Sequence, residues 1–104
     1  MKITYTGRHL VLAPSQTVEL DAEFGKVAKL LDTPKGEAQA HVILSHEHGS
    51  NQAEVTVAWR HHEIVGQAEN GDLFTAIHQA VDKVRVQILR QREKMRDTKR
   101  AAVQ

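Results

Sequence analysis

The sequence predicts a single α+β domain in which a four-stranded sheet carries two helices on one face. Apolar residues recur with helical spacing near both ends of the chain and with the alternate spacing of strands in between. The connections between the three central strands are short, which favours antiparallel neighbours. The predicted element order is therefore βαβββα, a two-layer sandwich.

Composition narrows the class of protein further. The 104 residues suffice for one domain with a core of its own. There is no cysteine, so neither disulfides nor thiolate metal sites are available. No N-terminal apolar run resembles a signal peptide, and no segment approaches the roughly 20 apolar residues of a membrane span. We therefore expect a soluble cytoplasmic protein without a membrane partner.

The first quarter of the chain predicts a strand followed by a helix. Residues 2–6 alternate polar and apolar side chains up to Gly7, which predicts a short strand. Pro14 and Ser15 mark a helix start, with the proline in the first turn or the serine as N-cap. Four apolar residues then follow at helical spacing: Leu20, Phe24, Val27 and Leu31. A proline and a glycine within residues 33–36 predict the end of this helix.

Three strands are predicted between residues 40 and 68, with turns at residues 49–51 and 60–62. Alternate residues of these strands are small or apolar, as expected of the face that meets the core. This inward set is Ala40, Val42, Leu44, Ala53, Val55, Val57, Trp59, Ile64, Gly66 and Ala68.

A second helix is predicted after the turn at Asn70 and Gly71, with Asp72 as its N-cap. Its apolar stripe consists of Leu73, Ile77, Val81, Val84 and Ile88. Since the stripe thins after Leu89, we expect the helix to project past the sheet. From about Asp97 onward we expect fraying, so that residues 1–96 form the folded domain and residues 97–104 a disordered basic tail.

Charge is distributed unevenly along the chain. Residues 83–100 hold eight of the fourteen Lys and Arg residues against two acids, a formal charge of +6. Residues 1–82 hold six bases and eleven acids, a formal charge of −5. Two opposed fields attract a polyanion to one face of a protein and repel it from another, which makes nucleic acid the first candidate partner.

The bases of the second helix are predicted to form two groups. At about 100° per residue, Lys83, Arg90 and Lys94 lie together opposite the apolar stripe. Arg85, Arg92 and Arg96 lie beside it. Such residues could form a solvated face with i,i+4 ion pairs, but the acids needed for this pairing are mostly missing. Like charges repel by a few tenths of a kcal/mol per pair, so we favour a binding role.

The four aromatic residues restrict the mode of binding. Phe24 and Phe74 lie on apolar helix faces, and Tyr5 and Trp59 alternate with polar strand residues. We expect all four in the core, so stacking on exposed rings is not predicted. Nucleic acid would be bound through phosphates and shape.

Several segments resemble one bacterial family. They are AENGDLFTAI at residues 68–77 followed by Val81, Asp82 and Lys83, ITYTGRH at residues 3–9, and FGKVAKLLD at residues 24–32. Their order and spacing are similar to those of ribosome hibernation promoting factors, which are also named ribosome-associated inhibitors or sigma-54 modulation proteins. The resemblance spans residues 2–96. It implies the same βαβββα order and a fold similar to the double-stranded-RNA-binding domain.

The resemblance also implies a function. Members of this family bind the small ribosomal subunit and its 16S rRNA in the tRNA/mRNA channel near the decoding centre, and they inhibit translation under stress or in stationary phase. Basic residues on both helices face the RNA, and the matching positions here are Lys26, Lys83, Arg90, Arg92 and Lys94. Together with the charge pattern, the candidate contacts are Lys26, Lys29, Lys83, Arg85, Arg90, Arg92, Lys94 and Arg96. The resemblance implies no cofactor and no small-molecule substrate, and we expect a monomer when the protein is free.

Three positions depart from the pattern of the family. Glu23 stands where relatives often have a base, His78 where an Asp is common, and Val86 where a base is expected. The first helix is therefore expected to be the weaker RNA contact. Since the chain ends at Gln104, we expect the short form of the family. Both kinds of short member share this domain, which leaves open ribosome dimerisation or silencing of single ribosomes.

Other function classes find less support. His46, His48, His61 and His62 could conceivably hold a divalent ion, but no carboxylate or cysteine completes a ligand set, so we expect no metal. Histidines on the strands would add positive charge only below about pH 6.5. Glycine-rich phosphate loops, nucleophile elbows and informative carboxylate pairs are absent from the sequence, which predicts that the protein is not an enzyme. A free-standing binder of structured or double-stranded RNA, and a protein-interaction module with a basic tail, remain as alternatives.

Overall fold

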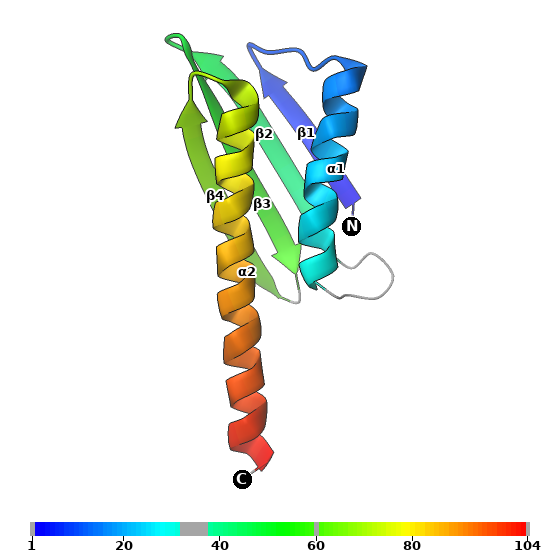
Figure 1. Ribbon diagram of the computed structural model, residues 1–104, viewed down its shortest axis with the longest axis vertical. Coiled ribbons are helices and arrows are strands. Elements are labelled where there is room, and N and C mark those ends of the chain that lie inside the picture. Colours follow the sequence, from blue (N-terminus) through cyan, green and yellow to red (C-terminus); the bar gives the residue numbers. More distant parts are fainter. Residues whose placement is uncertain (1, 32–37, 60, 104) are drawn as a thin grey trace.

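A computed structural model describes residues 2–31, 38–59 and 61–103, with side chains up to Lys94. The elements follow one another as β1 (Lys2–Arg8), α1 (Pro14–Leu31), β2 (Gln39–Glu47), β3 (Ser50–Trp59), β4 (His62–Asn70) and α2 (Leu73–Val103) (Figure 1). The predicted βαβββα order is confirmed. Residues 33–36, where the helix break was predicted, lie outside the described residues.

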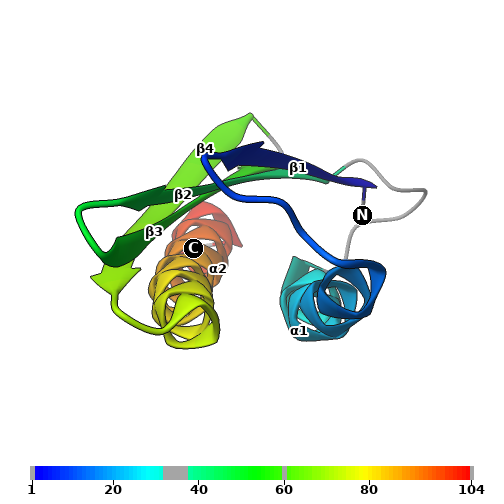
Figure 2. The same ribbon diagram turned by 90° about the horizontal axis from the view of Figure 1, so that it is seen from above.

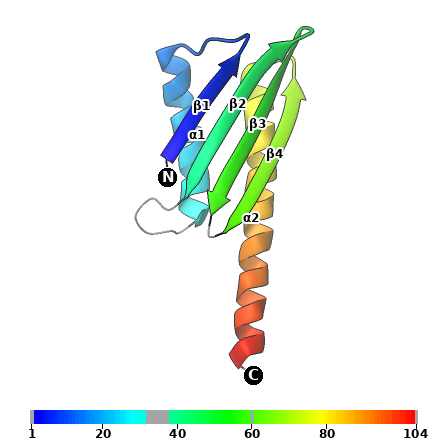
Figure 3. The ribbon, with the colours of Figure 1, turned by 180° about the vertical axis from the view of Figure 1, so that it is seen from behind.

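The four strands form one sheet in the order β1-β2-β3-β4. β2, β3 and β4 are antiparallel neighbours, as their short connections predicted. β1 runs parallel to β2, because α1 forms the crossover between them, so the sheet is mixed. Both helices cover the same face of the sheet (Figure 2), and in the described part of the chain the opposite face carries no helix (Figure 3).

The core lies between the sheet and the two helices. All four predicted core residues of α1 are buried, and so are Ile77, Val81, Val84 and Ile88 of α2. The inward set of β2, β3 and β4 is buried as predicted, except that Ala68 is only partly buried. Trp59 and Phe24 belong to this core, and Tyr5 and Phe74 are packed against it. Among the described residues, no Phe, Tyr or Trp ring therefore lies fully exposed on the sheet for base stacking.

The hairpin turns differ from their prediction. Glu47 pairs with Ser50, so the β2–β3 turn consists of His48 and Gly49, and the prediction of residues 49–51 was wrong. Both turn residues have positive φ, 53° and 74°, which is the backbone of a tight two-residue turn that matches the twist of the strands. In the β3–β4 connection Trp59 pairs with His62, so His62 lies in β4 rather than in the turn. Arg60 lies outside the described residues.

Both helices begin close to the predicted residues. Pro14 occupies the first position of α1, and the Gln16 side chain accepts a hydrogen bond of 2.8 Å from the N–H of Ala13. Ala13 rather than Ser15 is thus the N-cap. In α2 the prediction was right: Asp72 Oδ2 accepts bonds from the N–H and the hydroxyl of Thr75, at 2.9 and 2.7 Å.

α2 is much longer than the strands that it covers. Its 31 residues span about 46 Å, whereas the ten residues of β3 span about 33 Å. The helix therefore projects beyond the sheet (Figure 1), as predicted. The fraying of the chain from about Asp97 onward stays a prediction.

Candidate nucleic-acid interface

One flank of α2 faces the free edge of β4. Lys83 Nζ donates a hydrogen bond to the carbonyl oxygen of Gln67, and Gln87 Nε2 donates one of 2.7 Å to the carbonyl oxygen of Val65. Lys83 therefore lies beside the sheet, although its side chain remains exposed. By helical spacing Arg90 and Lys94 continue along the same flank. We name Lys83, Arg90 and Lys94 the β4-side ridge.

This placement corrects the prediction that these three bases lie opposite the apolar stripe. Ala76 and Ala80 of α2 are also fully buried. They widen the buried face toward β4 and rotate its centre toward Lys83. At about 100° per residue the three bases lie about 120° from the centre of the five larger apolar residues and about 100° from the centre of all seven, so they flank the buried face rather than oppose it.

The other flank of α2 faces α1. Arg92 Nη1 donates a hydrogen bond of 3.1 Å to the carbonyl oxygen of Leu30, in the last turn of α1. Arg85 lies on this flank and forms an ion pair of 3.2 Å with Asp82. We name Arg85 and Arg92 the α1-side ridge. Arg96 follows on it by spacing, but its side chain lies outside the described residues.

In the part of α2 whose side chains the structure describes, up to Lys94, a crest without bases separates the two ridges. Asp82, Val86 and Glu93 occupy the side of α2 opposite the core, and all three are exposed. Val86 stands where the family resemblance predicted a base. α2 thus presents two cationic ridges with a neutral-to-acidic crest between them, rather than one cationic face.

The bases of α1 contribute less. Lys26 forms an ion pair of 3.4 Å with Glu23, and the other carboxylate oxygen of Glu23 lies 2.9 Å from Nδ1 of His78 in α2. Lys29 is exposed in the last turn of the helix. Glu23 therefore offsets the charge of Lys26 and links the two helices. That α1 is the weaker RNA contact stays a prediction.

The ion pairs at Lys26 and Arg85 do not close the site to phosphate. Exposed pairs three residues apart on a helix contribute about 0–1 kcal/mol, because solvent screens them. An RNA phosphate can replace the carboxylate at such a cost. The sequence marked Glu23 and His78 as departures, but no sequence signal showed that residues 55 positions apart meet.

Hydrogen bonds at the turn before α2 hold the first residues of this helix in place. The bonds from Thr75 stabilise the Asp72 carboxylate and lower the pKa of this group below its usual value. Asn51, the one buried polar residue among those described, donates a bond of 2.9 Å to the carbonyl oxygen of Gly71 and lies 2.9 Å from Nδ1 of His46. These contacts tie the turn to the sheet.

The histidines do not converge. His46 and His48 lie at one end of β3 and His61 and His62 at the other, about 30 Å away. His48 lies in the turn between β2 and β3 with a positive φ, whereas His46 lies in β2. In the part of the chain that the structure describes, no three His, Asp or Glu side chains are grouped to hold a metal ion.

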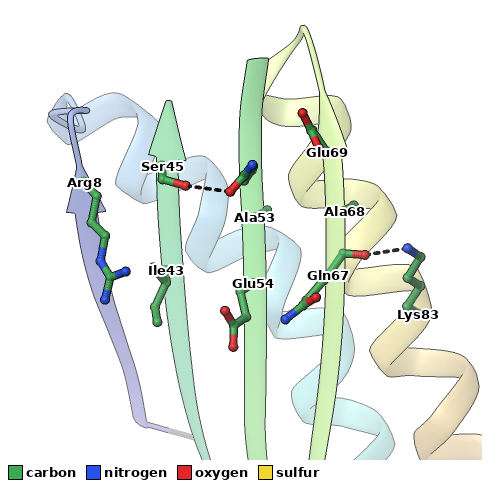
Figure 4. Close-up of a pocket in the computed structure, with 10 residues that line it drawn as sticks. Arg8, Ile43, Ser45, Ala53, Glu54, Gln67, Ala68, Glu69 and Lys83 are labelled. Atoms are coloured by element: carbon green, nitrogen blue, oxygen red, sulfur yellow. Dashed lines mark hydrogen bonds between the residues drawn. The ribbon is translucent and has the colours of Figure 1, made fainter. Parts of the chain in front are cut away.

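A shallow hollow of about 460 Å³ lies on the uncovered face of the sheet (Figure 4). Its charged lining residues are Arg8, Glu54, Glu69 and Lys83. Two acids oppose two bases, so this face lacks the uniform positive charge that phosphate binding needs.

Among the described residues, no helix is long and apolar enough to cross a membrane.

Comparisons with known proteins identify the family and the fold of the chain. The chain matches the family model of sigma 54 modulation protein / S30EA ribosomal protein over residues 3–96. No curated protein matches it in sequence. The N-terminal domain of Protein Y from Thermus thermophilus is 27% identical with a TM-score of 0.78, covering 86% of this chain and 98% of that one. A ribosomal subunit interface protein from Coxiella burnetii shares the fold at 17% identity, with a TM-score of 0.76 and coverage of 89% and 99%. The chain therefore belongs to the sigma 54 modulation protein / S30EA ribosomal protein family, whose members are ribosome-associated modulation factors.

Proposed function

We propose that this protein is a ribosome hibernation factor that binds the small ribosomal subunit through its 16S rRNA. The site would be the tRNA/mRNA channel near the decoding centre, and binding would inhibit translation under stress or in stationary phase. Family membership supports ribosome association, and one structural neighbour is named for the interface between ribosomal subunits. The family is one of binding factors rather than a known class of enzymes. The protein would act in the cytoplasm, as a monomer when free.

The observation that carries the proposal is the pair of cationic ridges on α2. Helical spacing repeats their bases along both flanks, and the helix extends beyond the sheet, where an RNA can approach it from several sides (Figure 1). Lys83 and Arg92 are held in place by bonds to main-chain oxygens rather than by carboxylates, so their positive charge is not neutralised. Fixed, uncompensated cations are what phosphate contacts require.

A co-sedimentation assay tests the proposal. The chain is pelleted with purified small subunits, alongside a Lys83→Glu, Arg90→Glu, Lys94→Glu variant. We expect the variant to lose association while its free energy of unfolding stays within about 1 kcal/mol, because exposed positions contribute little to folding. The matched control, Lys2→Glu with Arg8→Glu on β1, should pellet as the unchanged chain does.

Other outcomes would indicate the other functions. Equal affinity for any duplex RNA, without preference for the small subunit, would indicate a free-standing binder of structured RNA. Indifference to RNA of every kind would indicate a protein-interaction module. A folded triple variant that still pellets would remove the β4-side ridge from the interface.

A further inference from the structure

The two edge strands of the sheet differ in whether side chains bind their outward main-chain groups. At the β4 edge, the side chains of Gln87 and Lys83 bind the outward carbonyl oxygens of Val65 and Gln67. These bonds block the edge against another strand. β1 forms the opposite edge of the sheet (Figure 3).

The outer edge of β1 presents main-chain groups for pairing. The N–H of Lys2 donates to the carbonyl oxygen of Ala38 at 3.2 Å, so Lys2 turns its main chain toward β2. Because successive residues of a strand turn these groups to alternate sides, Ile3 and Tyr5 turn theirs outward. Among the described residues, no hydrogen bond reaches the main-chain N–H or C=O of either residue from that side.

The open stretch is rigid and has a defined end. Ile3 and Tyr5 pack their side chains against the core, and the Tyr5 hydroxyl donates to Asp21 of α1. Burial and the neighbouring Asp21 carboxylate raise the pKa of Tyr5, so the hydroxyl keeps its proton. At Gly7 the following chain returns so closely that a Cβ would lie 2.4 Å from the carbonyl oxygen of Leu10. The accessible edge is therefore a preformed segment centred on Ile3 and Tyr5.

The positive charge of β1 determines which kind of strand can pair with its outer edge. On the uncovered face of the sheet, Thr4 and Thr6 bond sideways to β2, through Ala40 O and the His41 ring. The two remaining side chains of this face, Lys2 and Arg8, are exposed, and β1 contains no acid. A second copy of β1 would bring bases against bases, which disfavours self-association.

We propose that the β1 edge is a docking site for an extended segment of a partner protein that carries carboxylates at alternate positions. The segment would add a fifth strand, with main-chain hydrogen bonds at Ile3 and Tyr5. Its carboxylates would lie beside Lys2 and Arg8 as cross-strand pairs. Because β2 and β3 separate β1 from β4, the site is independent of the α2 ridges, and RNA and peptide can bind together.

The test uses a short peptide of alternating Glu and Val, with its termini blocked, and the full chain labelled with ¹⁵N. On titration we expect amide shift changes and slowed amide exchange at Ile3 and Tyr5. A peptide of alternating Lys and Val should bind more weakly. The same Glu/Val peptide with N-methyl groups along its pairing edge should not bind, because it cannot donate the main-chain bonds.

A charge swap completes the test. The Lys2→Glu, Arg8→Glu variant should lose about tenfold in affinity for the Glu/Val peptide and gain affinity for the Lys/Val peptide. The matched control, Lys26→Glu with Lys29→Glu on α1, should keep the original preference. Binding of the N-methylated peptide, an unchanged preference in the β1 variant, or absence of binding at millimolar peptide would each overturn the proposal. None of these results bears on ribosome association, which the α2 variant tests separately.

Discussion

At the scale of single residues, main-chain groups position two cations of the candidate interface. Lys83 and Arg92 donate to carbonyl oxygens of β4 and α1, and Asp72 caps the helix that carries both. Carbonyl oxygens orient a base without cancelling its charge. By contrast Glu23 partly cancels Lys26, which explains why one of the two helices dominates the positive field.

The cap at Asp72 gives a prediction about pH. The pKa of Asp72 is lowered in the folded protein, so its contribution to stability is present above its usual pKa and is lost as the pH falls through the lowered value. Asp72→Ala should lower the melting temperature by a few degrees at neutral pH. Asp72→Asn should keep most of the cap, and its difference from the unchanged chain should shrink below about pH 4. Melting followed by circular dichroism across this range checks both expectations; a deficit of Asp72→Ala that persists undiminished in acid would contradict the assigned role.

At the scale of elements, the packing of α2 on the sheet depends on a glycine. A Cβ at Gly66 of β4 would lie 2.4 Å from the carbonyl oxygen of Ala80 and 2.9 Å from a methyl group of Val84. Ala76 and Ala80 supply the matching small residues on α2. This close approach sets the rotation of α2 and thereby the direction of both ridges.

Two glycine substitutions of opposite effect test this packing. Gly66→Ala should lower the free energy of unfolding by about 1–3 kcal/mol, because a backbone oxygen cannot move aside easily. Gly25→Ala in α1 should raise it by about 0.5–1 kcal/mol, since a Cβ there meets nothing within 4 Å and alanine favours the helix. Chemical denaturation measures both; a neutral Gly66→Ala would show that α2 lies farther from β4 than described.

Most of the fold could be predicted from the sequence, because strand alternation, helix capping and helical apolar spacing all indicate the same elements. The alternation in β2 to β4, the cap at Asp72 and the stripe on α2 each depend on near neighbours. The sequence did not predict which flank of α2 meets which neighbour. That depends on the buried Ala76 and Ala80, whose small side chains give no strong pattern, and on contacts such as Glu23–His78 between distant residues. The choice of the candidate bases therefore stays a prediction, whereas the placement of Lys83 opposite the apolar stripe was wrong.

At the scale of the whole molecule, the charge pattern and the fold define two different faces. The helical layer carries the ridges, whereas the uncovered face of the sheet mixes Arg8 with Glu54 and Glu69 (Figure 4). The long axis of 55 Å follows α2, so its bases are spread along an extended line. Such a line suits the phosphates of a structured RNA.

Salt dependence measures how many phosphates this line meets. If about six of the eight bases of residues 83–100 contact phosphates, log K should fall against log[salt] with a slope of roughly −4 to −5. Affinity for small subunits measured over a range of potassium concentrations gives this slope. A value near −1 would mean that α2 is not the main contact.

Cryo-electron microscopy of the protein bound to the small subunit tests the central claim most directly. We predict α2 against 16S rRNA in the tRNA/mRNA channel, with Lys83, Arg90 and Arg92 at phosphates and the uncovered face of the sheet turned away. A map that shows the sheet face on the RNA and α2 exposed to solvent would contradict it.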